Sequence, residues 1–346
     1  MKEQQQITET YKRKIAIRNT LIIIGCLVLL IISLIISMNA GYIKMSPLDT
    51  LRTLFGEGTD KEKMILFDFR LPRIVISMLT GMGLALSGCI IQNVAKNPLA
   101  DSGLLGINAG ASLMVILYVM VFSTESFLSV FTLPFLALIG AGATAVLVYI
   151  FSYKKNEGVT TMRLILTGVA VQAGVSALTT LLVVKLDETQ YNFVVAWMSG
   201  SIWGSNWNFV LALLPWLLVL IPYTLTKASV MDILNLSDDI AYGLGVSVEK
   251  ERRRLLTVAV ALAASCVSVS GSISFVGLIS PHLSRRLVGS RHRTLLLTTS
   301  LVGALLVSIA DTIGRVIIQP SEIPTGIVVA IIGAPYFLYL LSRSNQ

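Results

Sequence analysis

Charge-free apolar stretches dominate this chain and constrain its fold more than any other feature. Nine stretches contain no Asp, Glu, Lys or Arg, and most are long enough to cross the hydrocarbon core of a bilayer, which takes about 20 residues in a helix. They cover residues 19–38, 74–95, 102–124, 126–153, 164–184, 189–226, 255–284, 294–310 and 323–342. The sequence therefore predicts an all-α integral membrane protein.

The composition agrees with this prediction and excludes other classes of protein. Hydrophobic residues make up 54% of the chain and charged residues 13%, about half the share of a soluble domain. A soluble enzyme, a disordered chain and a disulfide-stapled secreted module are thereby excluded. Cys26, Cys89 and Cys266 lie singly in apolar stretches without a C-x-x-C spacing, so we expect neither a disulfide nor a metal site from them.

The basic residues predict how often the chain crosses the membrane. Stretch 255–284 has Arg252–Arg254 before it and Arg285 and Arg286 after it. Basic residues gather on the cytoplasmic side, so the chain between these two clusters should cross outward and return. Residues 271–277 offer a flexible turn, and the short return helix must be buried among other helices. We therefore expect about ten transmembrane helices with both termini cytoplasmic, an orientation that most of the 27 Lys and Arg residues support.

The chain divides into a cytoplasmic basic tail, residues 1–18, and a single transmembrane domain, residues 19–346. Loop 227–254 is the one sizeable polar insertion between spans. Within it, residues 234–245 carry apolar side chains at helical spacing and end at a glycine, which predicts short amphipathic helices. We interpret this loop as a docking surface for a soluble partner.

Small residues four positions apart predict close packing between helices. Such pairs are Gly83 with Ser87, Gly106 with Gly110, and Gly200 with Gly204.

Two polar motifs stand at the ends of predicted spans. Arg70 and Arg73 begin one span on the extracytoplasmic side, where Arg315 is also expected. They either snorkel to the interface or form a positive rim for acidic groups of a partner, and Asp311 is placed to pair with Arg315 four residues on. The second motif, Asn-Pro-Leu-Ala at 97–100, breaks the helix on the cytoplasmic side and leads into an irregular passage, a candidate gate.

Several kinds of chemistry are missing from the sequence. The chain contains no Gly-Lys pair and hence no phosphate-binding P-loop, and it lacks the H-E-x-x-H and G-x-S-x-G motifs. We expect no catalytic residue, no cofactor and no metal. The net charge of +8 reflects cytoplasmic basic residues rather than binding of nucleic acid. Two alternatives stay open, an ion-driven secondary transporter and an intramembrane enzyme, although only Asp311 offers an acid for an ion site.

At these motifs the chain, from about residue 15 to its end, resembles the FecCD-type permease subunits of ATP-driven importers for iron–siderophore complexes, haem and cobalamin. The resemblance rests on Arg-Leu-Pro-Arg (70–73), Asn-Pro-Leu-Ala (97–100), Leu-Leu-Gly (104–106), Ala-x-x-Leu-Gly (241–245), Phe-Val-Gly-Leu-Ile-Ser-Pro-His (275–282), Ala-Asp-x-x-x-Arg (310–315), Glu-x-Pro-x-Gly (322–326) and Gly-Ala-Pro-Tyr-Phe (333–337). Ser102 stands where relatives often carry proline.

The resemblance implies the type II importer permease fold in a multi-pass protein of the bacterial plasma membrane. It implies a dimer with a second permease, either a copy or a paralogue, together with two cytoplasmic ATP-binding subunits and an extracytoplasmic binding protein. A ferric siderophore is the expected substrate, with haem or cobalamin as alternatives.

Residue roles also follow from the resemblance alone. Arg70, Arg73 and Arg315 would contact the binding protein. Asn97, Leu99, Thr161 and Met162 would form the cytoplasmic gate. Ala241, Leu244 and Gly245 would couple the permease to the ATPase.

Overall fold

The computed structural model describes residues 2–41, 43, 45–122, 129–154, 158–202 and 204–344, and these fold almost entirely as helices. The elements are α1 (Lys2–Asn39), α2 (Pro47–Leu54), α3 (Asp60–Lys63), the π-helix η1 (Met64–Arg70), α4 (Leu71–Val94), the 3₁₀ turn η2 (Ser102–Leu105), α5 (Ile107–Val121), α6 (Ser129–Ser152), the antiparallel pair β1 (Tyr153–Lys154) and β2 (Gly158–Val159), α7 (Thr161–Val183), α8 (Glu188–Met198), α9 (Trp207–Thr226), α10 (Ala228–Leu234), α11 (Asp238–Gly243), α12 (Val248–Ser270), α13 (Val276–Val288), α14 (His292–Ile317) and α15 (Thr325–Ser344).

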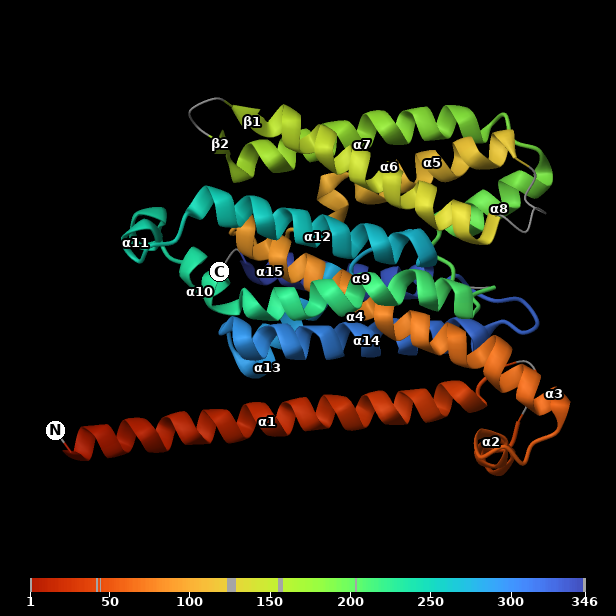
Figure 1. Ribbon diagram of the computed structural model, residues 1–346, viewed down its shortest axis with the longest axis horizontal. Coiled ribbons are helices and arrows are strands. Elements are labelled where there is room, and N and C mark those ends of the chain that lie inside the picture. The colour runs from red at the N-terminus through yellow and green to blue at the C-terminus, as the bar shows by residue number, and fades with distance from the viewer. Residues whose placement is uncertain are drawn as a thin grey trace.

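The long helices lie side by side along one axis and form a bundle (Figure 1). Within the described residues, eight helical segments are long and apolar enough to cross a membrane, and α5 is a shorter apolar helix of 15 residues. The expected all-α membrane fold is confirmed. The start of α1, the end of α15, α10 and α11 all lie at one end of the bundle, which we call the α11 end. Helices α2, α3 and α8 lie at the opposite end, the arginine end.

Helix α1 shows how the basic tail joins the first span. The helix runs without a break from Lys2 to Asn39, so the tail continues the first transmembrane helix. It packs along one side of the bundle, mainly on α14, where the hydroxyl groups of Ser33 and Ser308 lie 3.0 Å apart. Most of its large apolar side chains face outward, as suits a helix in contact with lipid.

The turn predicted within residues 255–284 is present. Helix α12 ends at Ser270, Gly271 has a φ of +66°, and α13 begins at Val276 after Phe275, which is left-handed at φ +68°. Helix α13 has only 13 residues, and its first turn is buried against α4. The prediction of a short, buried second helix after this turn is confirmed.

The stretch 189–226 differs from the prediction of one continuous span. It forms two helices, α8 and α9, because the chain turns at Gly200 and Gly204, which both have a positive φ. Asn206 then caps α9 by accepting hydrogen bonds from the backbone N–H groups of Asn208 and Phe209. The expected helix-packing pair of Gly200 and Gly204 is therefore wrong, since these residues form the connection between helices.

Helix α4 is the central element of the core, since it contacts α9, α12, α13 and α14. Its glycines allow these contacts, because a Cβ at Gly81 would overlap the backbone of Gly303 on α14, and one at Gly88 would overlap Gly277 on α13. A Cβ at Gly83 would overlap the Cys266 sulfur on α12. The Ser87 hydroxyl of α4 donates to the Ala259 carbonyl, which also belongs to α12. The predicted packing role of Gly83 and Ser87 is thus confirmed.

We predict that Gly88→Val destabilises the bundle by about 1–3 kcal/mol, because the added side chain forces α4 and α13 apart. The matched control is Gly174→Val on α7, where a Cβ meets no atom within 4 Å. Thermal unfolding of the two purified variants in detergent measures the difference. Equal melting temperatures would show that the contact between α4 and α13 tolerates extra volume.

Candidate functional site

At the arginine end, Arg73 lies in the first turn of α4 and is held by two carboxylates. Its Nε donates to Oδ1 of Asp311 on α14 at 2.9 Å, and its Nη1 donates to Oε2 of Glu322 at 2.7 Å. The Arg73 side chain is 10% exposed and that of Glu322 is 32% exposed. Arg73 therefore ties the start of α4 to α14 and to the segment before α15.

Arg315 extends this contact to α1. Its Nε forms an ion pair with Oδ2 of Asp311 at 3.3 Å, and its Nη2 donates to both the carbonyl and the hydroxyl of Ser37. Thr325 also donates to Asp311, at 3.1 Å. The predicted pairing of Asp311 with Arg315 is confirmed, and Asp311 is the centre of the network, with a 1% exposed side chain.

Arg70 completes the group by capping α1. It donates to the carbonyl groups of Met38 and Ile43, at and just beyond the C-terminal end of α1. We call these residues the arginine cluster (Arg70, Arg73, Asp311, Arg315 and Glu322). All three predicted docking arginines are therefore brought together at one end, but each is buried and engaged with groups of its own chain.

A cavity of about 330 Å³, the outer cavity, adjoins the arginine cluster. Its lining includes Arg73 and Glu322 together with Ala196 and Ser201, from α8 and the turn after it. Arg73 thus borders a space as well as the buried network. Glu322 was part of a sequence motif but carried no predicted role, because sequence alone does not place it next to Arg73, 249 positions away.

The predicted gate residues divide between two segments. Asn97 follows Lys96, whose φ of +46° turns the chain away from α4, and its Oδ1 accepts from the Leu99 backbone N–H at 2.9 Å. Thr161 begins α7 after the β1–β2 pair, and the next residue, Met162, is 69% exposed. Both segments lie toward the α11 end (Figure 1).

Asp101 is a half-buried acid that the sequence reasoning missed. It accepts hydrogen bonds from the backbone N–H groups of Ser102, Gly103 and Phe275. Phe275 is the N-cap of α13, so the carboxylate faces the positive end of a helix that begins inside the bundle. Its place directly after the Asn-Pro-Leu-Ala motif was the only signal that could have pointed to it. Asp101 therefore ties the segment after the predicted gate residues Asn97 and Leu99 to α13.

At the α11 end, the stretch 234–245 forms one short helix, α11, whereas α10 lies almost wholly before it, at Ala228–Leu234. Ala241 is fully buried, while Leu244 is 59% exposed and Gly245 ends the helix with a φ of +82°. Three further apolar side chains, Leu236, Ile240 and Tyr242, are also exposed. We call Leu236, Ile240, Tyr242 and Leu244 the α11 patch.

Polar contacts fasten α10 and α11 to the bundle. Asp238 pairs with Lys96 at 3.1 Å and with Arg252 at 2.8 Å. Burial disfavours the charged form of Asp238, but hydrogen bonds from Lys96 and Arg252 outweigh this effect and hold the pKa of its carboxyl below the usual value. The carboxylate therefore keeps its charge at neutral pH and down to mildly acidic pH. Sequence reasoning missed Asp238, although it lies inside the predicted docking loop.

A second pair of contacts joins α10 to helices α4 and α14. Asp232 accepts from the backbone N–H of His292 at 2.9 Å and lies 2.7 Å from its Nδ1. Asn93 on α4 donates to the Asn235 side chain at 2.8 Å. These contacts fasten α10 to the ends of α4 and α14.

Comparison with known proteins gives the chain its family. Residues 29–343 match the FecCD transport family, and the chain belongs to this family. It is 48% identical over 321 residues, 92% of this chain and 95% of the relative, to the iron(3+)-hydroxamate import system permease protein FhuG of Bacillus subtilis (strain 168). Two Fe(3+)-citrate import system permease proteins of the same organism, YfmE and YfmD, are 41% and 36% identical, covering 94% and 97% of this chain and 95% and 98% of their own lengths.

A solved structure supports the same conclusion. An ABC transporter of the metal-chelate type, in an inward-facing conformation, matches with a TM-score of 0.80 and 31% identity over 94% of this chain and 99% of that one. The chain therefore has the type II importer permease fold. Together with its membrane-spanning helices, this makes it a multi-pass protein of the bacterial plasma membrane.

We predict that Asp311→Asn destabilises the protein by about 3–5 kcal/mol, because it leaves buried guanidinium groups without their shared carboxylate. Asp239→Asn, at an exposed position of α11, is the matched control and should change stability by less than about 0.5 kcal/mol. Thermal unfolding in detergent compares the two variants. A loss no larger than that of the control would mean that Asp311 does not hold the arginine cluster together.

Proposed function

We propose that this chain is the permease subunit of an ATP-driven importer that carries a ferric siderophore across the plasma membrane after delivery by an extracytoplasmic binding protein. The observation that carries the proposal is the position of α4. One end of α4 holds Arg73 in the arginine cluster, and the other end is bound to α10 through Asn93. A single helix thus links the outer docking region to the inner coupling region.

Similarity between chains favours a hydroxamate siderophore as the substrate. The relative at 48% identity is named for iron(3+)-hydroxamate import, whereas the two relatives named for Fe(3+)-citrate stand at 41% and 36%. The ferric chelate of this class is the substrate we propose. Haem and cobalamin are the alternatives that the experiment below separates from it.

The proposed complex contains a second permease and two ATP-binding subunits. Two different chains of one organism, YfmE and YfmD, carry the name of the same citrate system, which supports pairing with a paralogue rather than with a second copy. This chain has no Gly-Lys pair, so we assign ATP hydrolysis to the partner subunits. The permease itself would supply the path and no catalytic group.

We propose that the arginine cluster supports the docked binding protein. Arg73 and its partner Glu322 both line the outer cavity, so an acidic group of a docked protein could approach Arg73 there and a basic group could approach the partly exposed Glu322. Arg70 and Arg315 are not among the residues that line this cavity and would hold α1 and α14 in place beside the docking surface.

The coupling mechanism we propose runs from the α11 patch to the gate. An ATP-binding subunit would contact the exposed Leu244, while Ala241 anchors the opposite face of α11 and Gly245 ends it. Asp238 would pass the motion of α11 to Lys96, which immediately precedes Asn97 of the gate. Asn97 and Leu99, with Thr161 and Met162 across the path, would then open and close it. Only different contacts in the two ATPase states can shift this equilibrium.

We expect that cells lacking the gene lose uptake of ⁵⁵Fe-ferrichrome, an uncharged tris-hydroxamate chelate, by about tenfold or more, and that the wild-type gene restores it. Uptake of radiolabelled haem and cobalamin serves as the control. Loss of haem or cobalamin uptake with intact ferrichrome uptake would replace the substrate. Ferrichrome uptake that continues after ATP depletion would favour an ion-driven transporter.

We also expect Leu244→Glu to uncouple the complex, because a charge in the α11 patch disrupts apolar contact with the ATP-binding subunit. Ferrichrome imported per ATP hydrolysed should fall about tenfold. Leu51→Glu places the same charge on a similarly exposed leucine of α2, at the arginine end, and should leave this ratio unchanged. Normal coupling in the Leu244 variant would remove the α11 patch from the ATPase interface.

A further inference from the structure

Helix α2 lies crosswise to the bundle at the arginine end. In Figure 1 it is seen end-on near the last turn of α1, with which it is in contact, whereas α1 and the other long helices run across the picture. Ser46 caps its first turn and Pro47 follows at the first helical position, so the helix starts at a defined residue soon after the chain leaves α1. Since α1 crosses the membrane, α2 runs along the membrane surface.

The side of α2 that faces the protein is polar. Thr50 and Thr53 are the buried residues of this helix. The Thr50 hydroxyl donates to the Asn39 side chain, at the end of α1, at 2.8 Å. A Cβ at Gly58, in the turn after α2, would overlap Thr53. Helix α2 therefore uses its polar side to contact the rest of the chain.

The outward side of α2 is apolar. Leu48, Leu51 and Phe55 are three and four positions apart, which places them on one face of the helix, and their exposed fractions are 59%, 57% and 80%. Leu54 is exposed beside them. A helix on the surface of a soluble protein has the reverse arrangement, with its apolar side on the core and its polar side in water. These four residues, which we call the α2 face, therefore need an apolar environment outside the chain.

The segments next to the α2 face carry the marks of a membrane boundary. The last turns of α1 expose Ile35 and Ile36, and η1, which is also in contact with α2, exposes Phe67 and Phe69. The indole N–H of Trp207 donates to the carbonyl of Phe67 at 2.8 Å. Tryptophan is enriched where the hydrocarbon core of a bilayer meets the headgroups. The α2 face therefore lies at this boundary.

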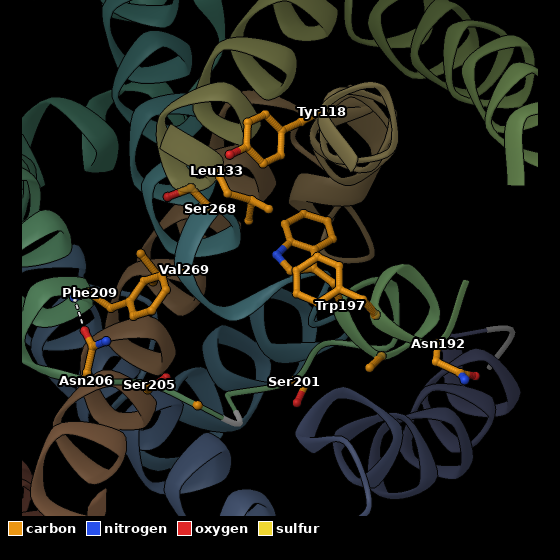
Figure 2. Close-up of a pocket in the computed structure, with 13 residues that line it drawn as sticks. Tyr118, Leu133, Asn192, Trp197, Ser201, Ser205, Asn206, Phe209, Ser268 and Val269 are labelled. Atoms are coloured by element: carbon orange, nitrogen blue, oxygen red, sulfur yellow. Dashed lines mark hydrogen bonds between the residues drawn. The ribbon is translucent and has the colours of Figure 1, made fainter. Parts of the chain in front are cut away.

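The α2 face lies apart from the two hollows described at the arginine end. The outer cavity is lined by Arg73, by α8 and the turn after it, and by the segment before α15. A pocket of about 530 Å³, shown in Figure 2, is lined by α5, α6, α8, α9, α12 and the connection between α8 and α9. Helix α2 instead lies beside α1, which packs along one side of the bundle (Figure 1). Lipid is the apolar environment at that side.

We propose that α2 is an interfacial anchor, whose α2 face inserts among the phospholipids of the leaflet at the arginine end. This inference requires the membrane fold but not the identity of the substrate. The apolar face of a helix in the membrane surface enters the boundary between headgroups and acyl chains to a depth of about 5–10 Å. Arg52 is exposed on the same helix, and its long side chain reaches toward lipid phosphate. Through Thr50 and Asn39, the anchor holds the end of α1 at a fixed depth.

Spin labels on introduced cysteines test this contact in the full-length chain, assembled with its partner subunits in phospholipid vesicles. The collision rate of each label is measured with oxygen, which concentrates in lipid, and with a water-soluble nickel chelate. The oxygen-to-nickel ratio at Leu48→Cys, Leu51→Cys and Phe55→Cys should exceed that of the control about threefold or more. The matched control is Glu57→Cys, at an exposed polar position just after α2. The three native cysteines are buried, and the unsubstituted chain gives the background labelling.

A scan through residues 47–55 separates lipid from other surroundings and does not depend on one variant. In lipid, the ratio follows the period of the helix and is highest at the α2 face. Ratios equal to the control along the whole helix would place the α2 face in water and overturn the proposal. Low collision rates with both reagents at the α2 face, before or after the binding protein is added, would show that protein covers it and would also overturn the proposal.

The anchor and the coupling of transport to ATP hydrolysis are measured separately. Helix α2 lies at the end of the bundle opposite to the α11 patch. Leu51→Glu should therefore weaken the contact with lipid and still serve as the control for ferrichrome imported per ATP hydrolysed.

Discussion

The absence of water from the bilayer core is the constraint on which this structure depends, because every buried polar group must find its partner within the protein. The bundle meets this constraint at Asp311, whose carboxylate is shared by Arg73 and Arg315. Without that shared acid, the buried Arg315 would lose its carboxylate partner, and Arg73 would be left with Glu322. The same contacts fasten α1, α4 and α14 to one another. The interactions that neutralise the buried charges therefore also hold the three helices together at the arginine end.

Helix α4 connects the charge network around Asp311 to the opposite end of the bundle. Its glycines bring it into backbone contact with α13 and α14, and such closely packed helices move together rather than sliding freely. Polar contacts are concentrated at its two ends, with Arg73 at one and Asn93 at the other. The middle of α4 is held by close helix packing, while its two ends are bound through Arg73 and Asn93 to other parts of the protein.

The sequence was sufficient for the features that depend on local physics. Charge-free stretches predicted the membrane helices, and the spacing in residues 234–245 predicted α11. The break between α8 and α9 was missed, because an apolar stretch without charges looks continuous until Gly200 and Gly204 take a positive φ. The partners of Arg73 and the outer cavity beside it depend on contacts between distant helices, which periodicity cannot reveal. The burial of Arg70, Arg73 and Arg315 also depends on contacts between distant helices, so the sequence did not predict it.

The short helix α13 has a consequence for how the protein is made. A segment of 13 residues that carries Arg285 and Arg286 in its last turn is too short and too polar to partition into lipid as an independent span. It is stable in the bilayer only where Gly277 packs against α4 and the Asp101 carboxylate contacts the first turn of the helix. During synthesis α4 and the loop after it emerge first, so the order of elements along the chain ensures that the receiving surface exists before the segment that requires it. Chain order is thus itself part of the information that directs membrane insertion.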